Sequence, residues 1–210
     1  MAKQFIKLQI SLFFKSNYSD QLEKASLLIK KEFGDGVVTQ LGIPANMPPE
    51  IPRLIIKSSS VDINLAINRI DFFSTDSSFF EKFFPNILNV LSGLSVEIGR
   101  IGVVTTTFKE ITIEELKNLF DKKVISTINP TQIVIRFNEV INLSGVNVNN
   151  SQMYESGFIK DEKNGSQKKG VIIMRDINTL LEDLSKNSFK DKVLTNFIRD
   201  AISKSEQILL

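Results

Sequence analysis

The chain opens with MAKQFIKLQISLFF (residues 1–14), in which apolar residues at every second position alternate with mostly polar ones. Successive side chains of a β-strand point to opposite faces of the sheet, so a period of two predicts a strand with one buried face. The polar residues between the apolar ones, and the lack of a small-residue cleavage site after them, argue against a signal peptide. The buried positions are expected to be Ile6, Leu8, Ile10, Leu12 and Phe14.

The rest of the first half predicts a helix, a loop, a hairpin, a second helix and a strand. In chain order these are residues 20–33, 34–52, 54–57 with 61–73, 76–92 and 95–108. Pro85 inside the second helix lacks a backbone donor and predicts a kink or two consecutive short helices. The order of strand, helix, two strands, helix and strand is typical of a ferredoxin-like βαββαβ arrangement.

The second half predicts a short helix after Thr112-x-x-Glu115, several strands, a second short helix after Thr179-x-x-Glu182 and a final helix over 193–202. The strands are expected at 132–143, 146–148, 153–159 and 170–177, with Asn164-Gly165 at an exposed hairpin tip. We therefore expect an α+β fold, an antiparallel sheet with helices mainly on one face. We expect two halves that pack as one globular unit. The first, residues 1–128, contains the ferredoxin-like arrangement and a connecting helix. The second, residues 129–210, contains a hairpin and the C-terminal helix.

The composition excludes several classes of chemistry. The 210 residues include no His, Cys or Trp, which removes structural zinc, iron–sulfur, Cys–His and Ser–His sites. We expect no cofactor and no metal. An alternative, a Mg²⁺-dependent enzyme, requires the strand carboxylates of Asp71, Glu139 and Asp176 to converge. The net charge of +2 gives no general attraction to nucleic acid or membrane. Missing targeting signals and membrane-spanning segments lead us to expect a cytoplasmic protein.

Arginines within predicted strands are the most informative charged residues: Arg69, Arg100, Arg136 and Arg175. The apolar positions change from odd to even around Arg69 and from even to odd around Arg100, which predicts a bulge or a strand end beside each. One interpretation is an anion-binding or nucleic-acid-binding site where neighbouring strands are redirected together. The other is that these arginines pair with Asp71 and Glu97 or reach solvent.

Phenylalanine is unusually frequent, with 16 residues against two Tyr. In the helix expected at 76–92, Phe79 and Phe83 lie partly off the apolar stripe. Either this helix is buried on two sides, beneath the second half of the chain, or it presents an aromatic patch to a protein partner.

Short motifs resemble a sporadically distributed, uncharacterised bacterial protein family. They are Pro52-Arg53 at the start of the hairpin, Ile67-Asn-Arg-Ile70, Arg100-Ile-Gly102, Asp176 on a strand and Phe197 on the closing helix. The resemblance covers most of the chain and implies a bacterial origin, and it brings no activity with it.

From these features we expect a non-catalytic protein-binding or adaptor subunit of a bacterial cytoplasmic complex, which binds a protein partner or self-associates. The alternative is a nucleic-acid-binding protein that uses the strand arginines on an open sheet face. Its affinity would then fall steeply with added salt.

Overall fold

The alternating opening segment forms β1 (Lys3–Phe14), the middle strand of a nine-stranded sheet. The computed structural model describes residues 3–18, 22–34, 36–44, 46–59, 61–112, 114–115, 134–160 and 165–206. The strand order is β2-β3-β4-β5-β1-β6-β9-β8-β7, and every neighbouring pair is antiparallel. The other strands are β2 (Val37–Gln40), β3 (Leu54–Lys57), β4 (Asp62–Leu65), β5 (Arg69–Ser74), β6 (Ile98–Lys109), β7 (Val134–Leu143), β8 (Val146–Lys160) and β9 (Gln167–Thr179).

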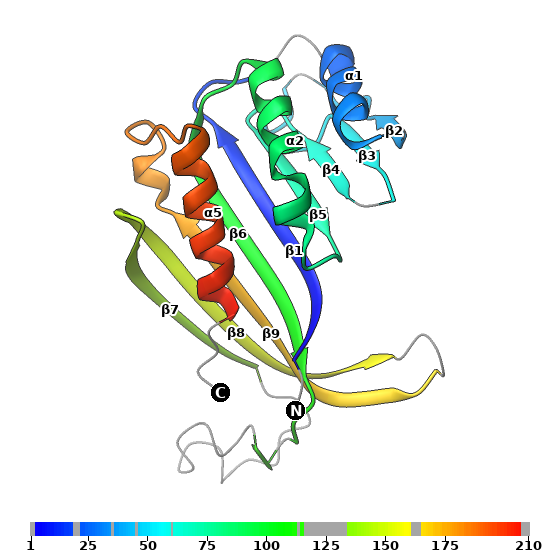
Figure 1. Cartoon of the computed structure of the whole chain (residues 1–210), viewed down its shortest axis with the longest axis vertical. Helices are drawn as coiled ribbons and strands as arrows, with labels where there is room; N and C mark the ends of the chain where they lie inside the picture. The colour runs from blue at the N-terminus through cyan, green and yellow to red at the C-terminus, as the bar shows by residue number, and fades with distance from the viewer. Residues whose placement is uncertain are drawn as a thin grey trace.

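The long helices of the described residues lie side by side over one face of this sheet (Figure 1). They are α1 (Leu22–Phe33), α2 (Phe79–Leu94) and α5 (Asp191–Glu206), and a short 3-10 helix, η1 (Leu181–Asp183), precedes α5. The core lies between the helices and the sheet. It combines Leu8, Ile10, Leu12 and Phe14 of β1 with the apolar stripes of the helices, such as Ile29 of α1 and Phe197 of α5. Ile6, expected to be buried too, is only half-buried, because the register of β1 shifts between Phe5 and Lys7. The fold is therefore α+β with an antiparallel sheet, and no described helix covers the opposite face, here called the open face.

The expected ferredoxin-like βαββαβ start is wrong, because four strands follow α1 instead of two. Residues 34–52, expected to be a loop, contain β2. The stretch 61–73, expected to be one strand, is divided into β4 and β5 by a turn at which the Ala66 N–H donates to the Arg69 carbonyl oxygen (2.9 Å). This turn accounts for the change in apolar phase near Arg69. All these strands join one large sheet with those of the second half, through the pairing of β6 with β9.

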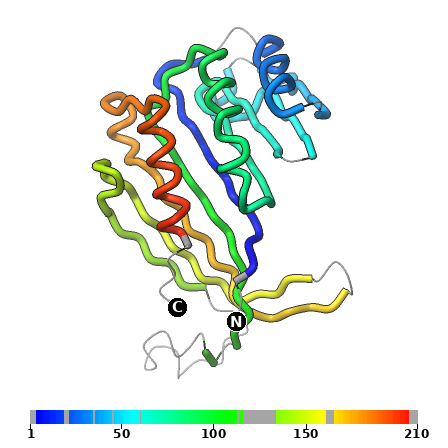
Figure 2. The backbone as a smooth tube through the Cα atoms, in the orientation of Figure 1, coloured from blue at the N-terminus to red at the C-terminus, as the bar shows by residue number. Residues whose placement is uncertain are grey.

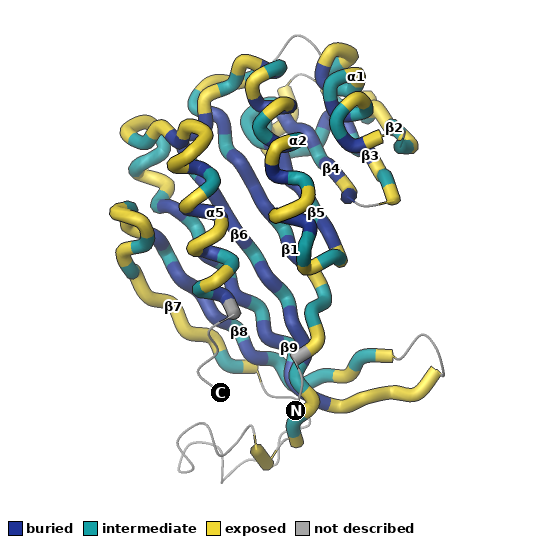
Figure 3. The backbone as a smooth tube through the Cα atoms, in the orientation of Figure 1, coloured by how far each residue is buried: buried dark blue, intermediate teal, exposed yellow. Residues whose placement is uncertain are grey.

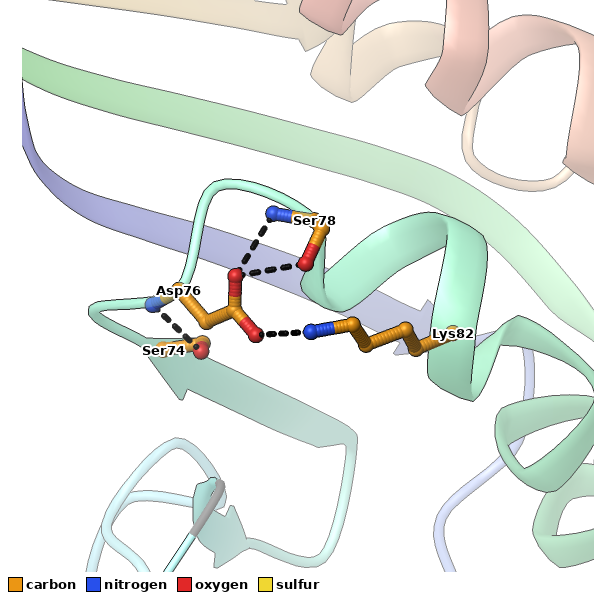
Figure 4. A network of polar contacts seen from close by, with 4 residues as sticks. All are labelled: Ser74, Asp76, Ser78 and Lys82. Atoms are coloured by element: carbon orange, nitrogen blue, oxygen red, sulfur yellow. Dashed lines mark hydrogen bonds and ion pairs between the residues drawn. The ribbon is translucent and has the colours of Figure 1, made fainter.

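Helix α2 runs as one helix through Pro85, not as two short ones. Asp76 lies just before it and holds its first turn (Figure 4). The Ser78 N–H and hydroxyl donate to Asp76 Oδ1 (2.9 and 2.6 Å), and Lys82 Nζ donates to Oδ2 (2.9 Å). These hydrogen bonds lower the pKa of Asp76 from 3.8 to about 2, and the bond from the Ser78 hydroxyl has the largest effect.

In the second half, β7 and β8 form a hairpin around Ser144-Gly145, whose positive φ angles (51° and 80°) suit a two-residue turn. The two strands expected at 146–148 and 153–159 are one continuous strand, β8. In Figure 2 the far end of the β8–β9 hairpin projects from the sheet. There Lys160 pairs with Gln167, beyond the point where β6 ends opposite Val171.

The capping box at Thr112 is confirmed, because the Thr112 N–H donates to Glu115 and the Glu115 N–H donates to the Thr112 hydroxyl. The helix expected after it falls within 116–133, outside the described residues. Asp20 and the hairpin-tip residues 161–164 are outside them too. Among the described helices, none has the length and apolarity needed to cross a membrane.

Candidate functional site

The open face carries alternate residues of each strand, and the strand register shows which of them are neighbours. At its centre Phe13 of β1 is opposite Arg69 of β5 on one side and Arg100 of β6 on the other. The guanidinium carbons lie 5.8 Å and 4.6 Å from the centroid of the Phe13 ring. Both distances are within the range of cation–π attraction. The structure thus brings two of the four predicted arginines together around one aromatic ring.

Local backbone features direct both arginines to this point. Arg69 is the first residue of β5, directly after the turn. Beside Arg100, the register between β1 and β6 shifts so that Gly99 has no direct partner, which is a β-bulge. A bulge or strand end beside each arginine is therefore confirmed. Gly99 permits the bulge because a Cβ there would lie 2.2 Å from the Leu184 carbonyl oxygen.

Of the two carboxylates expected to pair with these arginines, Asp71 and Glu97, only Asp71 does so. Arg69 Nε forms an ion pair with Asp71 Oδ2 (3.0 Å). Arg100 Nε donates to the Thr179 carbonyl oxygen (3.1 Å), whereas Glu97, its expected partner, binds Lys15. Burial lowers the pKa of Arg100, and the nearby Arg69 charge lowers it further, against the opposing effect of Asp176.

Arg136 lies on the same face, on the edge strand β7, and its Nε donates to the Ser151 hydroxyl (3.2 Å). Ser151 is opposite Asp176 of β9 in the strand register. Burial raises the pKa of Asp176, although a hydrogen bond from Asn178 and the charges of Arg100 and Arg136 lower it. Asp176 is thus within the electrostatic reach of both arginines.

The three arginines of the open face share one property. Each uses Nε for its contact within the described residues, and neither terminal nitrogen of Arg69, Arg100 or Arg136 has a partner there. A guanidinium has five N–H donors, of which the terminal nitrogens carry four. Each side chain therefore keeps a two-pronged donor for a ligand, which is the arrangement that binds phosphate and carboxylate groups bidentately.

Arg175 does not belong to this group, because it lies on the helix-covered face and is 6 % exposed. Its Nε donates to Asn150 Oδ1 (2.9 Å), and its Nη1 donates to the Lys204 carbonyl oxygen near the end of α5 (2.6 Å). Asn150 in turn donates to Glu139 Oε1 (2.7 Å). Arg175 thus connects three strands and a helix, which is a structural role.

Phe79 and Phe83 do not form an exposed aromatic patch. Phe79 is 1 % exposed, and Phe83 is half-buried between Phe79 and Phe33 of α1, with ring centroids 5.3 and 6.0 Å apart. The helix is buried on two sides, as the alternative interpretation held, although α1 and not the second half of the chain covers this pair. These two residues therefore offer no exposed aromatic patch to a partner.

The carboxylates required for the Mg²⁺ site do not converge. Glu139 accepts its hydrogen bond from the buried Asn150 on the helix-covered face, whereas Asp71 and Asp176 are on the open face. Strands β1 and β6 separate those two aspartates, a distance of about 14 Å at normal strand spacing. Among the described residues, no group of three or more acidic residues is arranged to hold a metal ion.

Sequence reasoning missed the aromatic and lysine residues of the open face. Lys7 Nζ lies 4.5 Å from the centroid of the Phe73 ring. Beside them is a hollow of about 450 Å³, lined also by Lys57 and Asn64. The sequence does indicate these two rings. Phe13 is odd-numbered, like the polar residues of β1, and Phe73 is odd-numbered, like Arg69 of β5, so both rings are expected on the polar face of the sheet.

Comparison with known proteins adds no relative, because no family model matches the chain and no curated protein does. Function is therefore inferred from the side chains of the open face.

Proposed function

We propose that this protein binds single-stranded nucleic acid on the open face of its sheet. The observation that carries the proposal is that three arginines, whose terminal nitrogens have no partner among the described residues, share this face with two half-buried phenylalanine rings, Phe13 and Phe73. Arginine forks bind phosphate groups, and aromatic rings on a sheet surface stack with unpaired bases. The side chains for both kinds of contact alternate across neighbouring strands.

The arrangement favours a single strand over a duplex. The rings lie on a broad sheet surface, and stacking on them requires bases that are free of a partner, which a duplex does not offer. The hollow beside Phe73 has Lys7 and Lys57 on its wall, so a base on this ring would have cations nearby for its phosphate.

The expected salt dependence follows from the number of arginines. Each phosphate neutralised on a single strand contributes about −0.7 to the slope of log K against log salt, so three contacts give a slope of about −2. This value is moderate because only three arginines contribute to it. It separates the proposal from nonspecific attraction to a strongly basic protein, for which this chain lacks the charge.

The adaptor hypothesis loses its main support, since it relied on Phe79 and Phe83 being exposed.

The test is fluorescence anisotropy with labelled single strands of about 20 nucleotides and the matching duplex, titrated with salt. Arg100→Gln removes one arginine, and we expect about 10-fold weaker binding or more, with a slope smaller by about 0.7. Phe13→Leu keeps the apolar contact and loses the ring, so binding weakens by about 5-fold or more at an unchanged slope.

Arg199→Gln is the matched control. Arg199 is an exposed arginine of α5, its Nε 3.5 Å from Glu81 on the helix side of the molecule. This variant should bind like the original chain. The proposal fails if the original chain shifts no single strand at about 50 mM salt, or if Arg199→Gln weakens binding as much as Arg100→Gln does. Thermal melts of all variants verify that they are folded.

A further inference from the structure

We propose that two copies of this chain pair through strand β7, in antiparallel register about a two-fold axis at Phe137, so that the sheet continues from one copy into the other. This inference does not depend on nucleic-acid binding. It concerns the edge strand β7, on which only Arg136 belongs to the three arginines of the open face.

Within the part of the chain that the structure describes, strand β7 has the properties of an unprotected edge. It is the last strand in the sheet order, and no described strand lies beyond it. Figure 3 shows it exposed along most of its length. Val134, Phe137 and Val140 are 55 %, 45 % and 63 % exposed. Monomeric proteins protect such edges with charged side chains, above all Lys, or with Pro, bulges or short strands. The ten residues of β7 contain no Lys or Pro, and their pairing with β8 has no register shift. The two charged residues of β7, Arg136 and Glu139, form hydrogen bonds with Ser151 and Asn150 of β8.

The opposite edge, β2, shows the contrast. It has only four residues, and Val37 is its exposed apolar residue. A short strand is itself a protected edge. We therefore assign the pairing to β7.

The geometry of the β7–β8 hairpin determines which N–H and C=O groups of β7 point away from β8 and can bind a second strand. Leu143 and Val146 are directly opposite each other across the two-residue turn, so they form the hydrogen-bonded pair that closes it. Hydrogen-bonded pairs alternate along an antiparallel ladder, and the odd-numbered residues of β7 thus direct their N–H and C=O groups toward β8. The even-numbered residues, from Val134 to Asn142, direct theirs to the outside.

A second β7 can use these groups only if even-numbered residues face even-numbered residues. Centring the two-fold axis on Phe137 satisfies this rule and places Phe137 opposite Phe137 of the second copy. It also places Val134 opposite Val140 of the second copy, so the two exposed valines of each copy contact apolar side chains of the other. Such cross-strand pairs stabilise a sheet by about 0.2–1 kcal/mol each.

This register also avoids charge repulsion. Arg136 is opposite Asn138 and Ile135 is opposite Glu139, so no two like charges are directly opposite each other. A shift by two residues would instead put Arg136 opposite Val140 and Phe137 opposite Glu139. Because the operation is a two-fold rotation, the pairing closes at two copies. The axis is perpendicular to the sheet, which leaves both open faces on the same side.

Sedimentation equilibrium of the full chain tests the dimer. We expect a mass near twice 23.7 kDa at high concentration, with dissociation on dilution. Val140→Lys places a charge on the edge and should weaken the dimer about 10-fold or more. Val37→Lys, the same change on the exposed β2 edge, should leave the mass unchanged. A mass of 23.7 kDa at every concentration, or equal effects of the two variants, overturns the proposal.

The register has its own test because the chain contains no cysteine. Phe137→Cys puts two thiols in a directly opposed pair, with Cα atoms about 4.5–5.5 Å apart, which suits a disulfide. Mild oxidation should therefore give a covalent dimer. Val140→Cys places its two thiols about 20 Å apart and should give none. Cross-linking of Val140→Cys, with none of Phe137→Cys, overturns the register.

Discussion

Replacing Arg175 with methionine should destabilise the protein without affecting its open face. The side chain is buried and donates to Asn150 Oδ1 and to the Lys204 carbonyl oxygen. Methionine fills a similar length with apolar atoms but donates nothing. The Asn150 oxygen, on a residue with no exposed surface, then lacks this donor, and the end of α5 loses its connection to β9.

The magnitude follows from these contacts. A hydrogen bond involving a charged group contributes about 1.5–3 kcal/mol, and a buried polar atom left without a partner costs about 1–3 kcal/mol. Removing a buried guanidinium offsets part of this loss, because its desolvation, which lowers the pKa of Arg175, also disappears. We expect a net loss of about 3 kcal/mol in the free energy of unfolding. For a chain of this size that corresponds to about 6–12 °C in Tm.

Urea denaturation followed by circular dichroism measures this loss. Arg136→Met is the matched control, because Arg136 is on the exposed edge strand, and its effect should stay within about 0.5 kcal/mol. A double-mutant cycle of Arg175→Met with Asn150→Ala should give a coupling of about 0.5–3 kcal/mol. The reasoning is refuted if Arg175→Met unfolds at the original urea concentration, or if its folded form no longer binds single strands that the original chain binds.

Two further changes test the backbone beside Arg100 and the start of α2. Gly99→Ala should cost about 1–3 kcal/mol of stability, because the new Cβ would lie 2.2 Å from the Leu184 carbonyl oxygen and must displace backbone; an unchanged thermal melt would contradict the close approach. Asp76→Ala should lower Tm at pH 7 by removing the contacts to Ser78 and Lys82. The pKa of Asp76 is lowered from 3.8 to about 2 in the folded state, so its contribution is present above pH 3.8 and is lost as pH falls through about 2. The Tm values of Asp76→Ala and the original chain should therefore converge over that range, and a difference that persists at pH 2 would disagree with this account.

The local elements were largely predictable because they depend on short-range periodicity. Alternation in residues 1–14 identified β1, and helical spacing with a following glycine identified α1. The phase changes beside Arg69 and Arg100 correctly indicated a strand end and a bulge. These signals need only neighbouring residues, since a strand period of two and a helix period of 3.6 are properties of the backbone itself.

The strand count of the first half was harder to predict. Strand β2 has four mostly exposed residues in a region rich in Gly and Pro, so its pairing with β3 leaves little trace in the hydrophobic pattern. The turn between β4 and β5 resembles a bulge or a strand end within one hairpin arm when only the sequence is considered, since apolar residues continue on both sides of it. These two points made the difference between a small βαββαβ unit and the nine-stranded sheet.

The sequence by itself determined the absence of imidazole and thiol chemistry, the α+β class and the position of each strand arginine on its own strand. Only the tertiary structure decided that Arg69 and Arg100 meet around Phe13, while Arg175 lies beneath α5. The physical reason is that alternation assigns a side chain to one of two faces of its own strand. Which strands become neighbours, and which face the helices cover, depends on contacts between residues far apart in the chain.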